Sequence, residues 1–149
     1  MDDKKIILLV EDDVADERLT LRALRKNNIM NEVVVACDGQ EALDFLFREG
    51  AYAGIGDAHL PALVILDLKL PKRSGLDVLR AIRGDVRTAG VPVVILTANE
   101  DPSIVQECYR IGANSFVRKP TNAAEFSDAV LQVAMYWLLV NRVPHAAAI

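Results

Sequence analysis

The sequence predicts a doubly wound α/β fold, in which a five-stranded parallel sheet carries helices on both faces. Short runs rich in β-branched and other apolar residues recur along the chain, and longer segments with apolar residues at helical spacing lie between them. Strands that alternate with helices form a parallel sheet, because each parallel connection needs a crossover. An apolar content of 52% in 149 residues is enough to fill one core.

The elements are expected in a regular order. Residues 6–10 form an unbroken apolar run, which is typical of a strand buried on both faces, and residues 14–27 show helical spacing. Pro102 fits the first turn of a helix at 102–111, and Asn122 is expected to open a last helix that runs to about Val140. The remaining predictions are strands at 32–37, 63–66, 91–96 and 115–117, and helices at 41–48 and 75–83.

Charge and composition exclude several classes of protein. With 17 basic and 21 acidic residues the net charge is −4, so neither nucleic acid nor an anionic membrane surface is the expected partner. The five apolar residues before Glu11 are too few for a signal peptide or a membrane span. Cys37 and Cys108 match no C-x-x-C spacing and are expected to be buried free thiols. We therefore predict a cytoplasmic protein with one domain at 4–143, a tail at 144–149 and no output domain.

Polar residues that could carry chemistry follow four of the five predicted strands. They are Glu11 and Asp12, Asp67, Thr97, and Lys119. In an open parallel sheet, ligands bind beyond the carboxyl ends of the strands. For any one of these residues an ordinary polar loop position is an equally good explanation, but their joint placement favours a site.

The three acids among these residues predict a metal ion. Converging carboxylates repel one another strongly unless a cation compensates for their charge. Oxygen ligands without a nearby cysteine or histidine favour Mg²⁺ over zinc or copper. Lys119 could partly replace the metal when none is bound.

Five blocks of the sequence resemble the receiver domains of two-component response regulators. They occur in the order and spacing of that family and cover nearly the whole chain. The resemblance implies the flavodoxin-like receiver fold, a signalling protein rather than an enzyme, and a cis peptide bond before Pro120. The blocks are Ile-Leu-Leu-Val-Glu-Asp-Asp at 7–13, Val-Ile-Leu-Asp-Leu-Lys-Leu-Pro at 64–71, Gly75, Leu-Thr-Ala at 96–98, and Phe-Val-Arg-Lys-Pro at 116–120.

The resemblance also implies the chemistry of the site. Asp67 would attack the phosphorus of a phosphohistidine on a sensor histidine kinase and become an acyl phosphate. Glu11, Asp12 and Asp67, with the backbone carbonyl of Lys69, would bind Mg²⁺, which would offset the charge on the transferring phosphoryl group. The resemblance thus implies Mg²⁺-dependent self-phosphorylation from a phosphodonor.

A conformational switch is implied by the same resemblance. Thr97 would donate its hydroxyl to one phosphoryl oxygen and Lys119 would pair with another, contacts that exist only after phosphorylation. Phe116 holds the switch-aromatic position and would rotate inward as Thr97 moves, although an ordinary core aromatic is the alternative. Ala98 is small enough to admit water, which would permit autodephosphorylation. Asp13 either binds metal through water or caps the following helix.

The end of the last predicted helix is more apolar than a receiver requires. Residues 129–140 are apolar at almost every position, although only one face of a terminal helix can pack on its own sheet. Tyr136, Trp137, Leu138 and Leu139 would be exposed in a monomer, so we expect a homodimer. The alternative is that the loop before the third strand or the C-terminal tail covers this surface.

The tail and the long loop resemble small receivers that are partnered with bacterial phytochrome histidine kinases. Such a protein would signal by interaction or relay its phosphoryl group to a histidine phosphotransfer protein. A phosphatase with an aspartate nucleophile typically carries a second acid two residues on, where this chain has Lys69. A mononucleotide binder needs a phosphate-binding loop after the first strand, where the acids at 11–13 would repel phosphate. A receiver that only binds proteins is a third alternative, which the complete site argues against.

Overall fold

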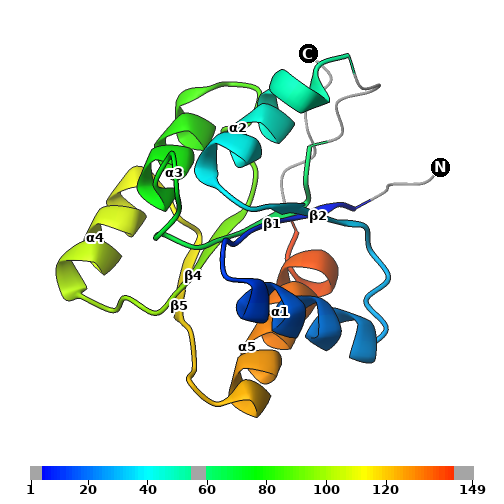
Figure 1. Cartoon of the computed structure of the whole chain (residues 1–149). Coiled ribbons are helices and arrows are strands. Elements are labelled where there is room, and N and C mark those ends of the chain that lie inside the picture. The colour runs from blue at the N-terminus through cyan, green and yellow to red at the C-terminus, as the bar shows by residue number, and fades with distance from the viewer. Residues whose placement is uncertain (1–4, 55–59, 143–149) are drawn as a thin grey trace.

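The computed structural model describes residues 5–54 and 60–142. Its main elements, in chain order, are β1 (Ile7–Val10), α1 (Val14–Lys26), β2 (Val33–Ala36), α2 (Gly39–Phe47), β3 (Leu63–Leu66), α3 (Gly75–Gly84), β4 (Val93–Thr97), α4 (Pro102–Ile111), β5 (Ser115–Arg118) and α5 (Ala123–Met135). The strands pair in the order β2-β1-β3-β4-β5, and every pair is parallel. Figure 1 shows α1 and α5 on one side of the sheet and α2, α3 and α4 on the other. The predicted doubly wound fold is confirmed.

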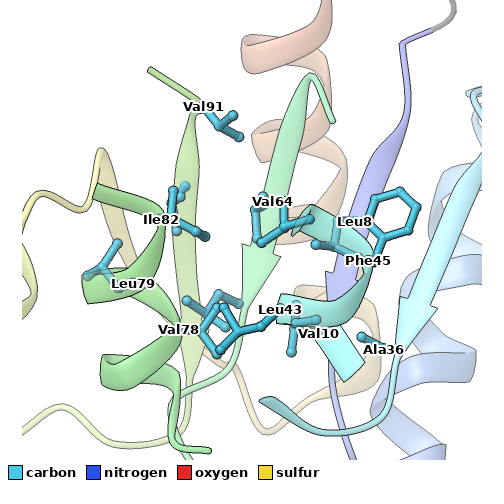
Figure 2. Packing of buried hydrophobic residues seen from close by; sticks show 14 of the residues in the cluster. Leu8, Val10, Ala36, Leu43, Phe45, Val64, Val78, Leu79, Ile82 and Val91 are labelled. Atoms are coloured by element: carbon cyan, nitrogen blue, oxygen red, sulfur yellow. The ribbon is translucent and has the colours of Figure 1, made fainter. Parts of the chain in front are cut away.

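Alternating side chains of the central strands divide the core into two layers. In β1, Leu8 and Val10 pack with α2 and α3, whereas Ile7 and Leu9 pack with α1 and α5. The strands β3 and β4 alternate in the same way, and burial on both faces explains their continuous apolar runs. Figure 2 shows part of the first layer, to which α2 and α3 contribute Leu43, Phe45, Val78, Leu79 and Ile82.

Side-chain caps fix where the helices begin. Asp38 caps α2, and Asn122 caps α5 as the sequence predicts. Asp13 caps α1, because its carboxylate accepts a hydrogen bond of 3.0 Å from the backbone N–H of Asp16. The capping role considered for Asp13 is therefore present in this structure.

Three local predictions differ from the structure. Cys108 is buried but Cys37 is exposed, because it follows the edge strand β2 at the open end of the sheet. No cis peptide bond occurs in the described ranges, so the bond between Lys119 and Pro120 has the ordinary trans form and the expected cis form is wrong. The last helix reaches Val140 as predicted, but its final turn, Tyr136–Val140, is a π-helix.

Gly75 lets helix α3 begin directly against the backbone that carries Asp67. Its N–H donates to the carbonyl of Leu68 at 2.8 Å. A Cβ atom at Gly75 would lie 2.3 Å from the carbonyl oxygen of Asp67 and 2.6 Å from the Cα of Leu68. Because both neighbours are backbone atoms, no side-chain rotation could relieve the clash.

We therefore expect Gly75→Ala to lower the free energy of unfolding by about 2–3 kcal/mol, since the added methyl group must displace the Asp67 backbone. Gly84→Ala is the matched control at the other end of α3, where a Cβ atom would meet nothing within 4 Å. Urea denaturation of both variants measures the difference. Equal stability of the two variants would contradict this account of the close approach.

Candidate functional site

The parallel register brings the predicted acids together at one edge of the sheet. Val10 of β1 is in register with Leu66 of β3, so the residues that follow them, Glu11 and Asp67, lie side by side. The backbone N–H of Asp67 donates to the carbonyl of Val10 at 3.1 Å, which extends the strand pairing to the acid itself. Asp12 begins the turn into α1 and is exposed.

The alternation of side chains along the strands decides which side of the sheet each polar group faces. Glu11, Asp67 and Lys119 continue the positions that face α1 and α5. Thr97 and Phe116 continue the positions that face α3 and α4. The acids and the lysine therefore approach the site from one side of the sheet, and the hydroxyl group of Thr97 approaches it from the other side, on which Phe116 also lies.

A cleft of about 1140 Å³ opens at this edge of the sheet. The predicted site residues that line it are Asp12, Asp67, Lys69, Thr97, Ala98 and Lys119. Glu11 is buried beside them, with 3% of its surface exposed. The polar residues at the strand ends were therefore enough to predict where this cleft lies.

Lys119 forms ion pairs with three carboxylates at the wall of the cleft. Its ammonium nitrogen lies 2.8 Å from Glu11 Oε1, 2.8 Å from Asp67 Oδ2 and 2.8 Å from Asp16 Oδ2. The other oxygen of Asp67 accepts a hydrogen bond of 2.7 Å from the backbone N–H of Leu68. Although burial of Lys119 favours its neutral form, the three hydrogen bonds raise its pKa above the ordinary value.

The negative charge of Glu11 is costly because its carboxylate is buried. Burial raises the pKa of this carboxyl from 4.5 to about 7, against the opposing effect of its contact with Lys119. The negative charge of Asp67 adds to the rise. A single ammonium therefore leaves the charge of the acids only partly compensated.

The donor set fits a hard divalent cation. One carboxylate oxygen from each of Glu11, Asp12 and Asp67 lies within 4.8 Å of the others. Carboxylate oxygens are the ligands that Mg²⁺ and Mn²⁺ take in proteins, and the adjoining cleft leaves room for water or phosphate oxygens. A bound cation would also stabilise the negative charge of Glu11, whose pKa is raised by burial.

Phe116 lies apart from the cleft, on the α4 side of β5. Its ring is half-buried and packs against the layer of the core under α2, α3 and α4. Its backbone N–H, on the edge strand, donates to the hydroxyl oxygen of Tyr109 at 3.0 Å. Both the switch role and the ordinary core role remain compatible with this position.

Asp16 is the site residue that sequence reasoning missed. It belongs to the first turn of α1, and its carboxylate reaches Lys119 from the helix. The signal available in the sequence was an acidic residue in the first turn of the predicted helix that directly follows the acids at 11–13.

The C-terminal residues predicted to form an interface do not share one environment. Leu138 is buried in the core, 3% exposed, so its assignment to an exposed interface is wrong. Trp137 is half-buried and packs on the same core layer, whereas Tyr136 and Leu139 are 48% and 65% exposed. The helix turns one residue in four toward the sheet, so Leu138 continues the stripe of Val130 and Ala134.

This helical stretch, Ala123–Val140, is long and apolar enough to cross a membrane by length and composition alone. It packs on the sheet through Phe126, Val130, Ala134 and Leu138, as a core helix of a globular domain does. Lys5, which precedes β1, donates to the carbonyl of Leu138 at 2.7 Å. Tyr136 and Leu139 therefore lie at the end of the sheet opposite the cleft.

Comparison with known proteins decides the family. The family model of the response regulator receiver domain matches residues 7–131. The chain belongs to this family. The receiver is similar to response regulator Rcp1 of Synechocystis sp., with 34% identity over 142 residues that make up 95% of each chain. The solved Mn²⁺-bound form of Rcp1 superposes with a TM-score of 0.87 at 33% identity, over 95% of this chain and 99% of that one.

Two further solved structures resemble the receiver over nearly its whole length. The phosphorylated cyanobacterial phytochrome response regulator RcpA has a TM-score of 0.87 at 35% identity and covers 95% of this chain and 99% of that one. The bacteriophytochrome response regulator AtBRR has a TM-score of 0.75 at 42% identity and covers 95% of this chain and 100% of that one.

Family membership establishes the general activity of the receiver. Receivers are signalling proteins of two-component systems, in which a histidine kinase is the partner and phosphorylation changes the signal. They bind a divalent metal through acidic residues, and the acidic cluster of this receiver is of that kind.

Proposed function

We propose that this receiver takes a phosphoryl group onto Asp67 from a phytochrome-type sensor histidine kinase and signals through the change that follows. The observation that carries the proposal is the setting of Asp67. Its side chain is 9% exposed at the wall of an open cleft, between the Lys119 ammonium and the backbone N–H of Leu68. Asp67 is thus the acid of the cluster whose carboxylate is held by hydrogen bonds and also lines the cleft that a phosphodonor would enter.

The transfer needs one bond to form and one to break. A carboxylate oxygen of Asp67 gives its electron pair to the phosphorus, and the electron pair of the phosphorus–nitrogen bond returns to the imidazole of the kinase. Lys119 supplies positive charge 2.8 Å from the accepting carboxylate, and Thr97 supplies a hydroxyl group in the same cleft. Lys119 is placed before the phosphoryl group arrives, so its orientation adds little to the cost of the transfer, whereas the Thr97 hydroxyl moves toward the phosphoryl group afterwards.

Glu11, Asp12 and Asp67, with the backbone carbonyl of Lys69, would hold the divalent cation, which we assign as Mg²⁺. When bound, the cation supplies positive charge that offsets the charge of the phosphoryl oxygens. The protein residues that surround it have complementary tasks. Lys119 holds the carboxylates in place from one side, and Ala98, exposed beside Thr97, leaves the cleft open to the water that removes the phosphoryl group.

We propose that Thr97 and Phe116 change position when Asp67 is phosphorylated. Both belong to the strand face toward α4, so a movement of the Thr97 hydroxyl toward the phosphoryl group changes the space next to the Phe116 ring. Phe116 has no hydroxyl group of its own, so packing alone sets its position. The surface altered by this movement is the one that α4 and β5 form.

The phytochrome partner is supported by the relatives of the chain. Both RcpA and AtBRR are phytochrome response regulators and match it over almost their full lengths. We assign the protein to the cytoplasm, where the kinase domain of such a sensor would meet it. Its phosphoryl group would then alter a protein interaction or pass to a histidine phosphotransfer protein.

Incubation with acetyl phosphate and Mg²⁺ tests the proposed function. We expect one phosphoryl group per chain, stable in acid and labile in base, as an acyl phosphate is. Removal of the metal with EDTA should slow incorporation by about a hundredfold or more, because Lys119 alone cannot offset the charge of the incoming phosphoryl group in addition to that of the acids. Intact-protein mass spectrometry measures both. Incorporation that is equally fast with EDTA would contradict the role of the acidic cluster.

We also propose that two copies of the receiver pair through the exposed side of its last helix. The residues of this side are Met135, Tyr136, Leu139 and Val140, which are between 44% and 65% exposed in the described structure. Exposed aromatic and aliphatic side chains that adjoin one another are typical of an interface. Trp137, half-buried beneath them, supports this surface through an edge contact with the Tyr136 ring.

Leu139→Glu should convert a dimer to a monomer, because the buried charge would lack a partner. Val86→Glu is the control, since Val86 is 92% exposed in the connection between α3 and β4, remote from the last helix. Sedimentation velocity over a concentration series measures the state of each. A wild-type protein that stays monomeric throughout the series would reject the dimer.

A further inference from the structure

Asp16 differs from the other two carboxylates that Lys119 contacts. Glu11 and Asp67 each belong to the group of acids that can share a cation, and Asp16 does not. All three lie 2.8 Å from the ammonium nitrogen of Lys119. A cation that takes the oxygens of Glu11 and Asp67 therefore leaves Asp16 as the carboxylate still free to hold the lysine.

The backbone of Asp16 is fixed from both sides. Its N–H donates to the Asp13 cap at 3.0 Å, and its carbonyl accepts a hydrogen bond of 2.8 Å from the hydroxyl of Thr20, which is buried. The Asp16 side chain is 26% exposed and lines the cleft, so it approaches Lys119 from the helix rather than from the strands. The first turn of α1 thus delivers one carboxylate to the site at a defined position.

Lys119 needs such a partner once the site is loaded. A divalent cation repels the ammonium and competes with it for two of its three carboxylates. Without another anion, the flexible lysine side chain would leave for the solvent, away from the phosphoryl group that it has to meet. We propose that Asp16 is the positioning residue that keeps Lys119 beside Asp67 when the metal is bound. This inference rests on the proposed function, because it assigns Asp16 a task within the same site.

The first test observes Lys119 itself and needs no phosphorylation. Protein labelled with ¹⁵N at the lysine ammonium groups is saturated with Mg²⁺, and the signal lost in Lys119→Met identifies Lys119. We expect this signal to persist in the wild type and to be lost in Asp16→Asn, because a released ammonium exchanges its protons with water rapidly. Asparagine keeps the shape of the side chain and removes its charge. Glu17→Gln, which removes the neighbouring charge of the same helical turn, should retain the signal.

Two results would overturn the proposal. One is a Lys119 signal that persists unchanged in Asp16→Asn with Mg²⁺. The other is a wild-type signal that already disappears when Mg²⁺ is added, since Asp16 would then fail to hold the lysine. If the wild type took up no phosphoryl group, the proposed function would fail, whereas this spectroscopic test would still decide the role of Asp16.

The second test measures the rate of phosphorylation by acetyl phosphate at saturating Mg²⁺. We expect Asp16→Asn to be about fivefold slower than the wild type, because one charge-assisted contact orients Lys119. In a Lys119→Met background the same substitution should have no further effect. A purely structural role would slow both backgrounds equally, and direct repulsion of the donor by Asp16 would make Asp16→Asn faster. Either result would contradict the positioning role.

Discussion

Asp67→Asn is expected to abolish phosphoryl uptake, with a loss of at least about a hundredfold in rate, because an uncharged amide is not a nucleophile for phosphorus. The substitution preserves the size of the side chain, and the single amide oxygen can still accept one of the two hydrogen bonds that Leu68 and Lys119 donate to separate oxygens of the carboxylate. The fold should therefore remain intact. Labelled acetyl phosphate with Mg²⁺ gives the rate, and circular dichroism checks the fold.

Asp128→Asn provides the matched control for this loss. Asp128 is an exposed carboxylate of α5, outside the residues that line the cleft. The control protein should take up the phosphoryl group at the wild-type rate. Uptake by Asp67→Asn at a similar rate would mean that another group is the acceptor.

Lys119→Met is expected to lower the free energy of unfolding of the metal-free protein by about 3 kcal/mol at pH 8, because it leaves buried carboxylates without their cation. The loss should shrink at pH 5.5. The pKa of Glu11 is raised to about 7 in the folded protein, so between pH 4.5 and 7 the folded state binds a proton that the unfolded chain has released. The contact with Lys119 lowers the pKa of Glu11, so the loss of Lys119 raises this pKa further, and the variant gains more stability than the wild type as the pH falls through this window. Urea denaturation at both pH values in EDTA measures the effect.

Lys72→Met is the control for the loss of a lysine charge. Lys72 is 68% exposed and its nitrogen lies 3.6 Å from Asp38, so its removal should change stability by less than about 0.5 kcal/mol. Added Mg²⁺ should stabilise Lys119→Met more than the wild type, since the cation replaces the missing charge. A penalty for Lys119→Met that is the same at both pH values would contradict the role of Glu11 in this effect.

Most of the fold followed from local patterns in the sequence. Strands that are buried on both faces appear as short apolar runs, and the acids that end them mark the carboxyl edge of a parallel sheet. The cleft could be predicted for that reason. Asp67 and Thr97 stand where β3 and β4 end, and this position does not depend on how the helices pack. The prediction needed only strand order along the chain, not side-chain packing.

Features that depend on packing between distant elements could not be predicted in the same way. Leu138 looked exposed because almost every neighbour in the helix is apolar, and only the packed structure decides which face meets the sheet. Cys37 is exposed because β2 is an edge strand. Asp16 was missed because its contact with Lys119 joins residues 103 positions apart.

Chemical trapping of the phosphorylated residue tests the central claim most directly. After incubation with acetyl phosphate and Mg²⁺, borohydride reduces an aspartyl phosphate to homoserine, and mass spectrometry of the digested protein locates the changed residue. We predict homoserine at position 67 and at no other aspartate, with none formed in the absence of acetyl phosphate. Homoserine at Asp12, Asp13 or Asp16, or an unchanged Asp67 in protein that carries phosphate, would contradict the assignment of Asp67 as the acceptor.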